Sequence, residues 1–182
     1  MGRLLPVIAV CALGAGVAGC AADDACPSFA HIVSADFGRT GDTLWWTLGV
    51  QQIPDALTFN QPDVPSNFLE YRWAIDLDSD RDGAVDLRLA IQHFAIMNGA
   101  PVTTGDILSQ TSEDLLQVMG GVASTVGTFD ASIDRTANTF RFETTTGAAP
   151  GLANVSDRGQ SSWRTTYRSG ADLEDQCDEQ YP

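Results

Sequence analysis

The sequence predicts an all-β protein: a single-domain antiparallel β-sandwich of the jelly-roll or immunoglobulin-like kind. Apolar and polar residues alternate with a period of two, which is typical of strands that bury one face. These alternating segments are short and are separated by turn residues along most of the chain. No repeat or long linker divides the 182 residues, so we expect one domain with a sizeable core.

The strands are expected, in chain order, at residues 31–37, 43–50, 70–77, 84–92, 125–134, 138–145 and 161–168. The strands at 125–134 and 138–145 should form a hairpin around residues 135–137. Residues 112–119 fit either a helical turn capped by Ser112 or a further strand. The segment 52–68 contains three prolines and is expected to be a loop, and the acidic segment 172–179 a solvated terminus.

The N-terminal segment has the features of an export signal. Arg3 precedes an apolar run over residues 4–17, which is shorter than the about 20 residues that span a membrane comfortably. The run ends in VAGC at residues 17–20, which resembles the lipobox of bacterial lipoproteins. The alternative is ordinary cleavage near Ala18 or Ala22, which would release a soluble protein.

The lipobox resemblance implies a signal peptide over residues 1–19 and a lipid such as palmitate on the sulfur of Cys20. A short tether over residues 20–30 would then lead to the domain at residues 31–182. The protein would be lipid-anchored on the extracytoplasmic side of a bacterial cell envelope, at the outer membrane or the cell surface. Its membrane contact would be the lipid alone.

Two cysteines remain once the one inside the signal and the lipidated one are set aside. Cys26 and Cys177 lie near opposite ends of the mature chain. In an oxidising, exported compartment they are expected to form a disulfide, which would bring the two ends of the domain together. The alternative is a pair of free thiols.

Charge excludes one class of partner. The chain has 24 acidic and 10 basic residues, a net charge of −14, and every basic residue is arginine. A surface this acidic repels phosphate backbones, so nucleic-acid binding is not expected. The lack of lysine also excludes Schiff-base and P-loop chemistry.

Residues 76–86 contain five aspartates in the sequence DLDSDRDGAVD. Compared with an EF-hand, ligand positions one, three, five and nine are filled by Asp78, Asp80, Asp82 and Asp86, and Gly83 stands at position six. Position twelve is Leu89, which cannot bind a cation. Both flanks alternate with the strand period, so this loop should join two strands and is not an EF-hand.

The hairpin predicted around the loop brings carboxylates together. Pairing Leu77 with Val85 places the apolar residues of both strands on one face, and it also places Asp76 opposite Asp86. Like charges directly opposite each other are destabilising, and a divalent cation would relieve the repulsion. Oxygen ligands on a flexible loop suit calcium.

The predicted calcium ligands are the side chains of Asp78, Asp80, Asp82 and Asp86 and the carbonyl of Ala84. Without a bidentate glutamate, the dissociation constant is expected at about 10⁻⁴ to 10⁻³ M. The alternative is a solvated acidic turn, with Arg88 diagonal to Asp76 and Arg81 screening the tip.

Four segments in this order resemble the DOMON superfamily and the related family 9 carbohydrate-binding modules: IVSAD at 32–36, DTLWWTL at 42–48, YRWAIDLDSDRDGAVD at 71–86 and SWRTTY at 162–167. The resemblance implies an exported sandwich that binds sugars or, in some branches, haem. A haem site would need His93 with Met97 or Met119 as axial ligands.

The tryptophan pair of the second strand bears on sugar binding. Trp46 shares a face with Leu44 and Leu48 and is expected in the core, whereas Trp45 should face outward. An outward tryptophan can stack on a sugar or mark a partner surface, and it can equally be covered by an arginine stem or by the loop at 52–68.

Motifs for catalysis are lacking: there is no G-x-S-x-G or H-E-x-x-H, and the only histidines are His31 and His93. We therefore expect a non-catalytic binding or structural module, with a glycan or an envelope protein as its partner. The second interpretation is a carbohydrate-binding module whose platform is Trp45 with the loop at 52–68. The third is a small secreted hydrolase, since paired carboxylates are plentiful.

Overall fold

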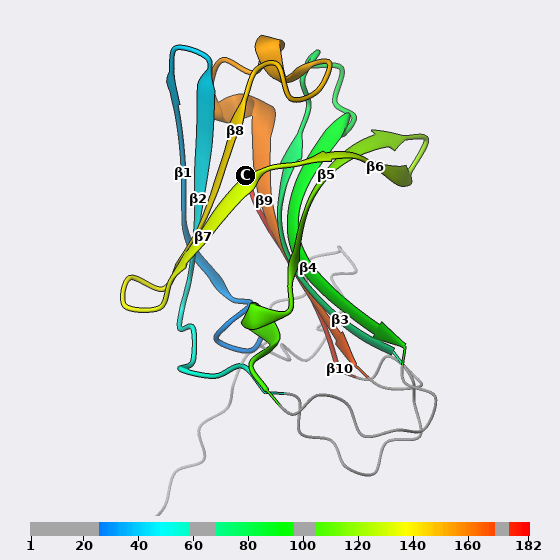
Figure 1. Ribbon diagram of the computed structural model, residues 1–182. Helices are drawn as coiled ribbons and strands as arrows, with labels where there is room; N and C mark the ends of the chain where they lie inside the picture. Colours follow the sequence, from blue (N-terminus) through cyan, green and yellow to red (C-terminus); the bar gives the residue numbers. More distant parts are fainter. Residues whose placement is uncertain (1–25, 59–67, 97–104, 170–174) are drawn as a thin grey trace, which may run out of the picture.

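The computed structural model describes residues 26–58, 68–96, 105–169 and 175–182, which form two antiparallel sheets packed face to face (Figure 1). The four-stranded sheet has the order β1 (Ile32–Thr40), β2 (Thr43–Val50), β8 (Thr139–Thr145) and β7 (Asp130–Asp134). The six-stranded sheet has the order β10 (Asp175–Tyr181), β9 (Ser161–Ser169), β3 (Phe68–Leu77), β4 (Leu87–Ile96), β5 (Ser112–Met119) and β6 (Val122–Thr128). The all-β, antiparallel sandwich predicted from the sequence is confirmed.

The core lies between the two sheets and is rich in aromatic side chains. Its largest fully buried members are Trp46, Trp73, Trp163, Phe140 and Phe142. The rings of Trp73 on β3 and Phe140 on β8 stack with their centroids 4.5 Å apart, which joins one sheet to the other. Burying each of these side chains contributes about 1.5–3 kcal/mol relative to leaving it exposed.

Most strands form where the alternation of the sequence places them. β2 has the predicted bounds, β3 and β9 cover all of their predicted residues, and β1 and β8 cover all but the first. Residues 112–119, for which a helical turn was the alternative, form strand β5. The predicted hairpin around residues 135–137 is also present, because β7 pairs with β8 across this turn.

Two predictions about strands are wrong. Residues 125–134 do not form one strand: β6 and β7 belong to different sheets, and Phe129 between them is 8% exposed in the core. The acidic segment at 172–179 is not simply a solvated terminus, because Asp175–Tyr181 forms edge strand β10. Its charge is accommodated there because Asp178 accepts two hydrogen bonds from Arg164 on β9, at 2.6 and 2.7 Å.

The predicted register of the β3–β4 hairpin is also wrong, by two residues. Leu77 pairs with Leu87 rather than with Val85, so Asp76 lies opposite Arg88 and not opposite Asp86. A two-residue shift leaves every side chain on the same face, and the hydrophobic pattern therefore cannot distinguish the two registers. The expected cross-strand repulsion is replaced by an ion pair between Asp76 and Arg88, with Arg164 3.8 Å from the same carboxylate.

One side of the sandwich is closed where β1 meets β10. Cys26 and Cys177 form the predicted disulfide, with their Cα atoms 5.2 Å apart and 151 residues between them in the sequence. His31 Nδ1 lies 3.0 Å from Glu179 Oε2 along the same seam. The predicted signal peptide and Cys20 lie outside the described residues.

Candidate metal site

The acidic loop, residues 78–86, joins β3 to β4 at one end of the sandwich. Its tight path needs two residues with left-handed backbone angles, Arg81 at φ 64° and Gly83 at φ 92°. Glycine adopts such angles without a steric penalty because it has no Cβ, which explains why glycine follows Asp82 in the sequence. The carboxylates of the loop accept backbone hydrogen bonds: Asp78 accepts from the N–H groups of Asp82 and Gly83, at 3.1 and 2.9 Å.

Three of the four predicted carboxylate ligands come together. Asp78, Asp80 and Asp86 each offer an oxygen within 4.8 Å of the other two. Asp82 is not part of this group, and its side chain accepts a hydrogen bond of 2.7 Å from the N–H of Ala84. The Asp82 side chain thus has a hydrogen-bond partner within the loop. The carbonyl of Ala84 stays a predicted ligand.

The electrostatics of the loop favour a cation. The hydrogen bond from the N–H of Asp82 lowers the pKa of the Asp80 carboxyl, but desolvation and the charges of Asp82, Asp86 and Asp78 together outweigh it. The net effect is a raised pKa for Asp80, although the side chain is exposed. Repulsion among the carboxylates is thus present in the folded loop even though Asp76 is neutralised elsewhere.

Asp86 is fixed more firmly than the other two carboxylates. Its Oδ2 accepts hydrogen bonds from the N–H of Ser79 at 2.8 Å and from the Ser79 hydroxyl at 2.6 Å. Ser79 is buried, and Gly151 approaches it so closely that a Cβ there would lie 2.8 Å from the Ser79 hydroxyl oxygen. Asp86 is therefore held by packed groups, whereas Asp80 lies in solvent.

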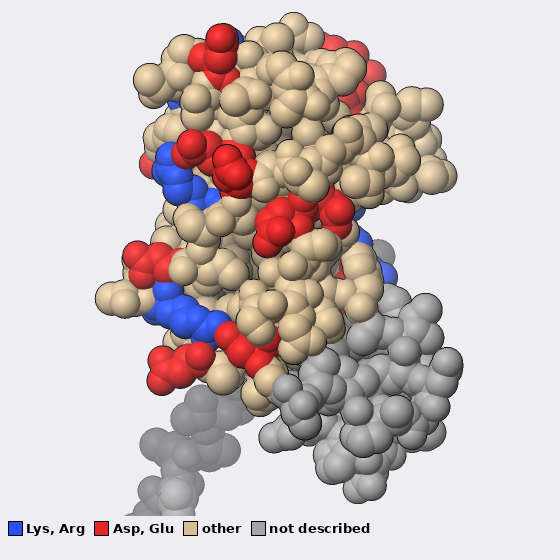
Figure 2. All heavy atoms as spheres, in the orientation of Figure 1, with Lys and Arg blue, Asp and Glu red and all other residues tan. Residues whose placement is uncertain are grey.

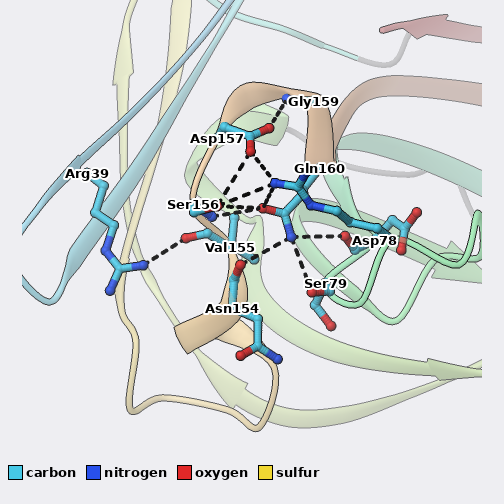
Figure 3. A network of polar contacts seen from close by, with 10 residues as sticks. Arg39, Asp78, Ser79, Asn154, Val155, Ser156, Asp157, Gly159 and Gln160 are labelled. Carbon is cyan, nitrogen blue, oxygen red and sulfur yellow. Dashed lines mark hydrogen bonds and ion pairs between the residues drawn. The ribbon is translucent and has the colours of Figure 1, made fainter.

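The β8–β9 connection fastens the loop to the body of the protein (Figure 3). This connection contains two short 3-10 helices, η2 (Leu152–Asn154) and η3 (Arg158–Gln160). The side chain of Gln160 is buried and donates to the carbonyls of Ser79 and Asn154, both at 3.2 Å, while its oxygen accepts from the Ser156 N–H at 2.9 Å. Arg81 adds an ion pair with Asp157.

Beside the loop the surface is hollowed. A depression of about 170 Å³ lies between the loop, the end of η3 and the start of β9, and Asp78, Gly83, Gln160 and Gln180 contribute to its wall. A neighbouring hollow of about 550 Å³ includes Arg158, Ser162 and Gln180. The guanidinium of Arg158 lies 4.8 Å from the ring of Trp163 and 5.8 Å from that of Tyr181.

The spacing of the three carboxylates would let one metal ion contact all of them. Calcium–oxygen distances of about 2.3–2.6 Å place ligands on opposite sides of the ion about 5 Å apart. The oxygens of Asp78, Asp80 and Asp86 lie within that spacing. Six to eight ligands are usual for calcium, so backbone carbonyls and water would have to complete the shell.

The other residues singled out from the sequence are placed as follows. Trp45 lies on the outer face of β2, half-buried, with the guanidinium of Arg141 4.8 Å from its ring and with the ring against Gly38. The alternative of a tryptophan covered by an arginine is thus the one observed. Trp46 is buried in the core as predicted. Most of the loop at 52–68 lies outside the described residues.

His93 and Met119 are not brought together. His93 follows Gln92, which pairs with Ser112 at the start of β5, and Met119 ends that strand. Seven residues of β5 separate Ser112 from Met119, which is about 23 Å along the strand. His93 Nδ1 instead lies 3.1 Å from the carbonyl oxygen of Gln110. Met97 lies outside the described residues.

Sequence reasoning missed the residues that support the loop. Gln160 and Asp157 have no motif spacing relative to the aspartates, since they are about 80 positions further along the chain, and Ser79 lies between Asp78 and Asp80 without marking itself as a support. Their one signal is local: residues 156–162 form a polar run, SDRGQSS, directly before an alternating strand. Such a run predicts a loop but does not show which segment it contacts.

Comparison with protein-family models finds no match. No curated protein and no solved structure matches the chain either. Among the described residues, no helix is long and apolar enough to cross a membrane.

Proposed function

We propose that the acidic loop is a calcium site and that the protein is a non-catalytic binding or structural module of a bacterial cell envelope. The observation that carries the proposal is the grouping of Asp78, Asp80 and Asp86 in a loop that Gln160 holds to the body. A bound cation would offset the repulsion that raises the pKa of Asp80. The role of the ion would then be to fix the loop and the hollow beside it.

Titration calorimetry with calcium chloride tests the site. We expect binding with a dissociation constant of about 10⁻⁴ to 10⁻³ M, and a rise in melting temperature at millimolar calcium. Asp80→Asn and Asp86→Asn should weaken binding at least about tenfold, because each removes a charged ligand from a set of three. Asp130→Asn is the matched control, since it changes the same charge on exposed strand β7.

The contrary results are equally clear. No heat and no change in melting temperature at millimolar calcium would remove the site. Equal weakening by Asp130→Asn would show that calcium responds to the net charge of −14 and not to the loop. Binding should also weaken as the pH falls toward the raised pKa of Asp80, because a protonated carboxyl is a poor calcium ligand.

The proposed location follows from the N-terminal segment and the disulfide. A structural disulfide is typical of exported proteins, and Cys26 lies six positions after Cys20. Cleavage before Cys20 and lipid attachment to its sulfur would hold the domain within about 20 Å of the membrane. Cys20→Ala should release the protein from the membrane fraction and abolish palmitate incorporation, whereas an unchanged distribution would contradict the anchor.

Carbohydrate binding is the second candidate, and one observation favours it. The hollow of about 550 Å³ beside the loop presents Arg158, Ser162 and Gln180, which are groups that bond sugar hydroxyls. Trp45, which Arg141 covers, is a poorer platform. A glycan array with calcium present tests the candidate: Gln180→Ala should abolish any signal that depends on this hollow, and Arg141→Ala should not.

A further inference from the structure

The hollow of about 550 Å³ near the start of β9 has hydrogen-bond donors in its wall. Arg158 and Gly159 come from η3, Ser162 from β9 and Gln180 from β10. Arg158 is exposed and gives the wall a positive charge. Pockets for small molecules are typically about 300–1,000 Å³, so a ligand of that size would fit and would meet this charge.

Arg158 differs from most other arginines in its partner. Among the described residues, every arginine except Arg39 and Arg158 has a carboxylate side chain within ion-pair distance. Figure 2 shows the same tendency on one face, where arginine atoms lie beside acidic atoms. Arg39 donates instead to main-chain carbonyls. Within the described part of the chain, Arg158 donates a single hydrogen bond, of 2.7 Å, to the main-chain oxygen of Pro182, although a guanidinium has five N–H groups.

The carboxylates around Arg158 are neutralised by other arginines. Asp157, the preceding residue, forms an ion pair with Arg81, and Asp178 on β10 forms one with Arg164. More distant charges are largely screened beyond the Debye length, which is about 8 Å at physiological ionic strength. The net charge of −14 therefore does not prevent one negative charge from binding at Arg158, but it does disfavour ligands with several.

A second donor beside Arg158 also lacks an acceptor. The guanidinium lies 4.8 Å from the ring of Trp163, whose buried Nε1 has no hydrogen-bond partner among the described residues. The indole N–H groups of Trp46 and Trp73 do have acceptors, a hydroxyl at 2.9 Å and a carbonyl at 2.8 Å. Buried N–H groups are nearly always paired, so the place where Arg158 meets Trp163 is short of acceptor atoms.

We propose that the hollow binds a small carboxylate that also carries hydroxyl groups, and that Arg158 holds the carboxylate. A planar guanidinium donates two parallel hydrogen bonds to a carboxylate, and one guanidinium balances one negative charge. Ser162 and Gln180 line the same hollow and are groups that bond hydroxyls. The inference rests on the second candidate function, ligand binding in this hollow, and adds the charge of the ligand and the residue that selects it.

An NMR titration of the whole, ¹⁵N-labelled protein tests the proposal, in a mild detergent that shields its N-terminal segment. EDTA in the buffer keeps calcium out of the measurement. Glucuronate should bind with a dissociation constant of about 1 mM and should shift the indole N–H signal of Trp163, which Trp163→Phe identifies. Methyl glucoside, which lacks the charge, and acetate, which lacks the hydroxyls, should each bind at least about tenfold more weakly.

Variants of Arg158 identify the residue that holds the carboxylate. Arg158→Gln should weaken glucuronate at least about tenfold, to the level of methyl glucoside, and Arg158→Lys should restore part of the loss. Arg141→Gln is the matched control, because Arg141 also lies 4.8 Å from a tryptophan ring but does not line the hollow. Unchanged melting temperatures would show that these variants fold.

Three results would overturn the proposal: no binding of glucuronate at about 20 mM, an equal affinity for methyl glucoside, or an equal loss with Arg141→Gln. Equal affinity for the two sugars would leave the carbohydrate candidate standing and would refute the selection of a carboxylate. None of these outcomes bears on calcium binding.

Discussion

Gln160 is the residue on which the position of the acidic loop depends most directly. Its side chain joins the acidic loop to the β8–β9 connection, because the amide nitrogen donates to Ser79 and Asn154 and the amide oxygen accepts from Ser156. Glutamine is suited to this place because it both donates and accepts. With 3% of Gln160 exposed, water cannot replace these partners.

Truncating Gln160 to alanine should therefore lower the free energy of unfolding by about 2–4 kcal/mol, since buried polar groups are left without partners. Gln160→Glu should be at least as harmful at pH 7, because a carboxylate cannot donate to the two carbonyls. Its deficit should shrink as acid protonates the glutamate. Denaturant unfolding measures both effects, with Gln180→Ala as the control.

Gln180 is a suitable comparison because it is exposed and its side chain donates a hydrogen bond of 3.2 Å to the Ser162 hydroxyl. We expect its loss to change the free energy of unfolding by less than about 0.5 kcal/mol. A similar cost for both glutamines would show that Gln160 is not a special anchor.

At the scale of elements, what the sequence predicted and what it missed have a common physical cause. Alternation of apolar and polar residues defines strands and their buried faces, so the bounds of β2 and the burial of Trp46 were predicted correctly. Alternation says nothing of shifts by two residues or of where a chain passes from one sheet to the other. The predicted register of β3 with β4 was therefore wrong, and so was the prediction of one unbroken strand through Phe129.

The candidate site follows the same division. The aspartates of the loop are a local pattern, and three of the four predicted carboxylate ligands lie together. The residues that hold the loop in place, such as Gln160, lie in the connection between β8 and β9. They are far from the loop in sequence, and no local pattern encodes such contacts. β10 was missed for a related reason, because an acidic sequence becomes a strand only when Arg164 of the neighbouring strand pairs with Asp178.

The attachment of β10 should depend on pH. The hydrogen bonds from Arg164 lower the pKa of Asp178, against an opposing effect of desolvation. A carboxyl whose pKa is lower in the folded than in the unfolded state stabilises the fold above its unfolded pKa of about 3.9, and this is lost as the pH falls through the lower, folded value. Since the side chain is 39% exposed, the contribution is screened and should be below about 1 kcal/mol.

Asp178→Asn should accordingly lower the melting temperature at pH 7, and the difference from the unmodified chain should shrink as the pH falls below the unfolded pKa and vanish below the lower, folded pKa. Scanning calorimetry at low salt measures this. Asp130→Asn removes a carboxylate from another edge strand, β7, and should show a smaller difference at pH 7. A difference for Asp178→Asn that persists undiminished in acid would contradict the role of its charge.

At the scale of the molecule, the disulfide and the acidic loop lie near opposite ends of the sandwich. Cys177 pairs with Tyr167, at the level of Tyr71 on β3, whereas the loop begins after Leu77. Six residues of strand correspond to about 20 Å. If the proposed anchor precedes Cys26, the loop and the hollow beside it face away from the membrane, where a ligand or partner has access.

The disulfide should supply much of the stability of the molecule. It closes a span of 151 residues, for which the chain-entropy model gives about 5 kcal/mol, and measured values are often 2–4 kcal/mol. Replacing Cys26 and Cys177 together by serine should lower the free energy of unfolding, measured by urea denaturation, by this amount. The dependence on urea should steepen, because the unfolded chain without its crosslink exposes more surface. The unmodified chain, unfolded and refolded in reductant, should have the same free energy of unfolding as the double variant. If the reduced chain were as stable as the oxidised protein, the core and the β1–β10 contact would hold the two sheets together without help from the disulfide.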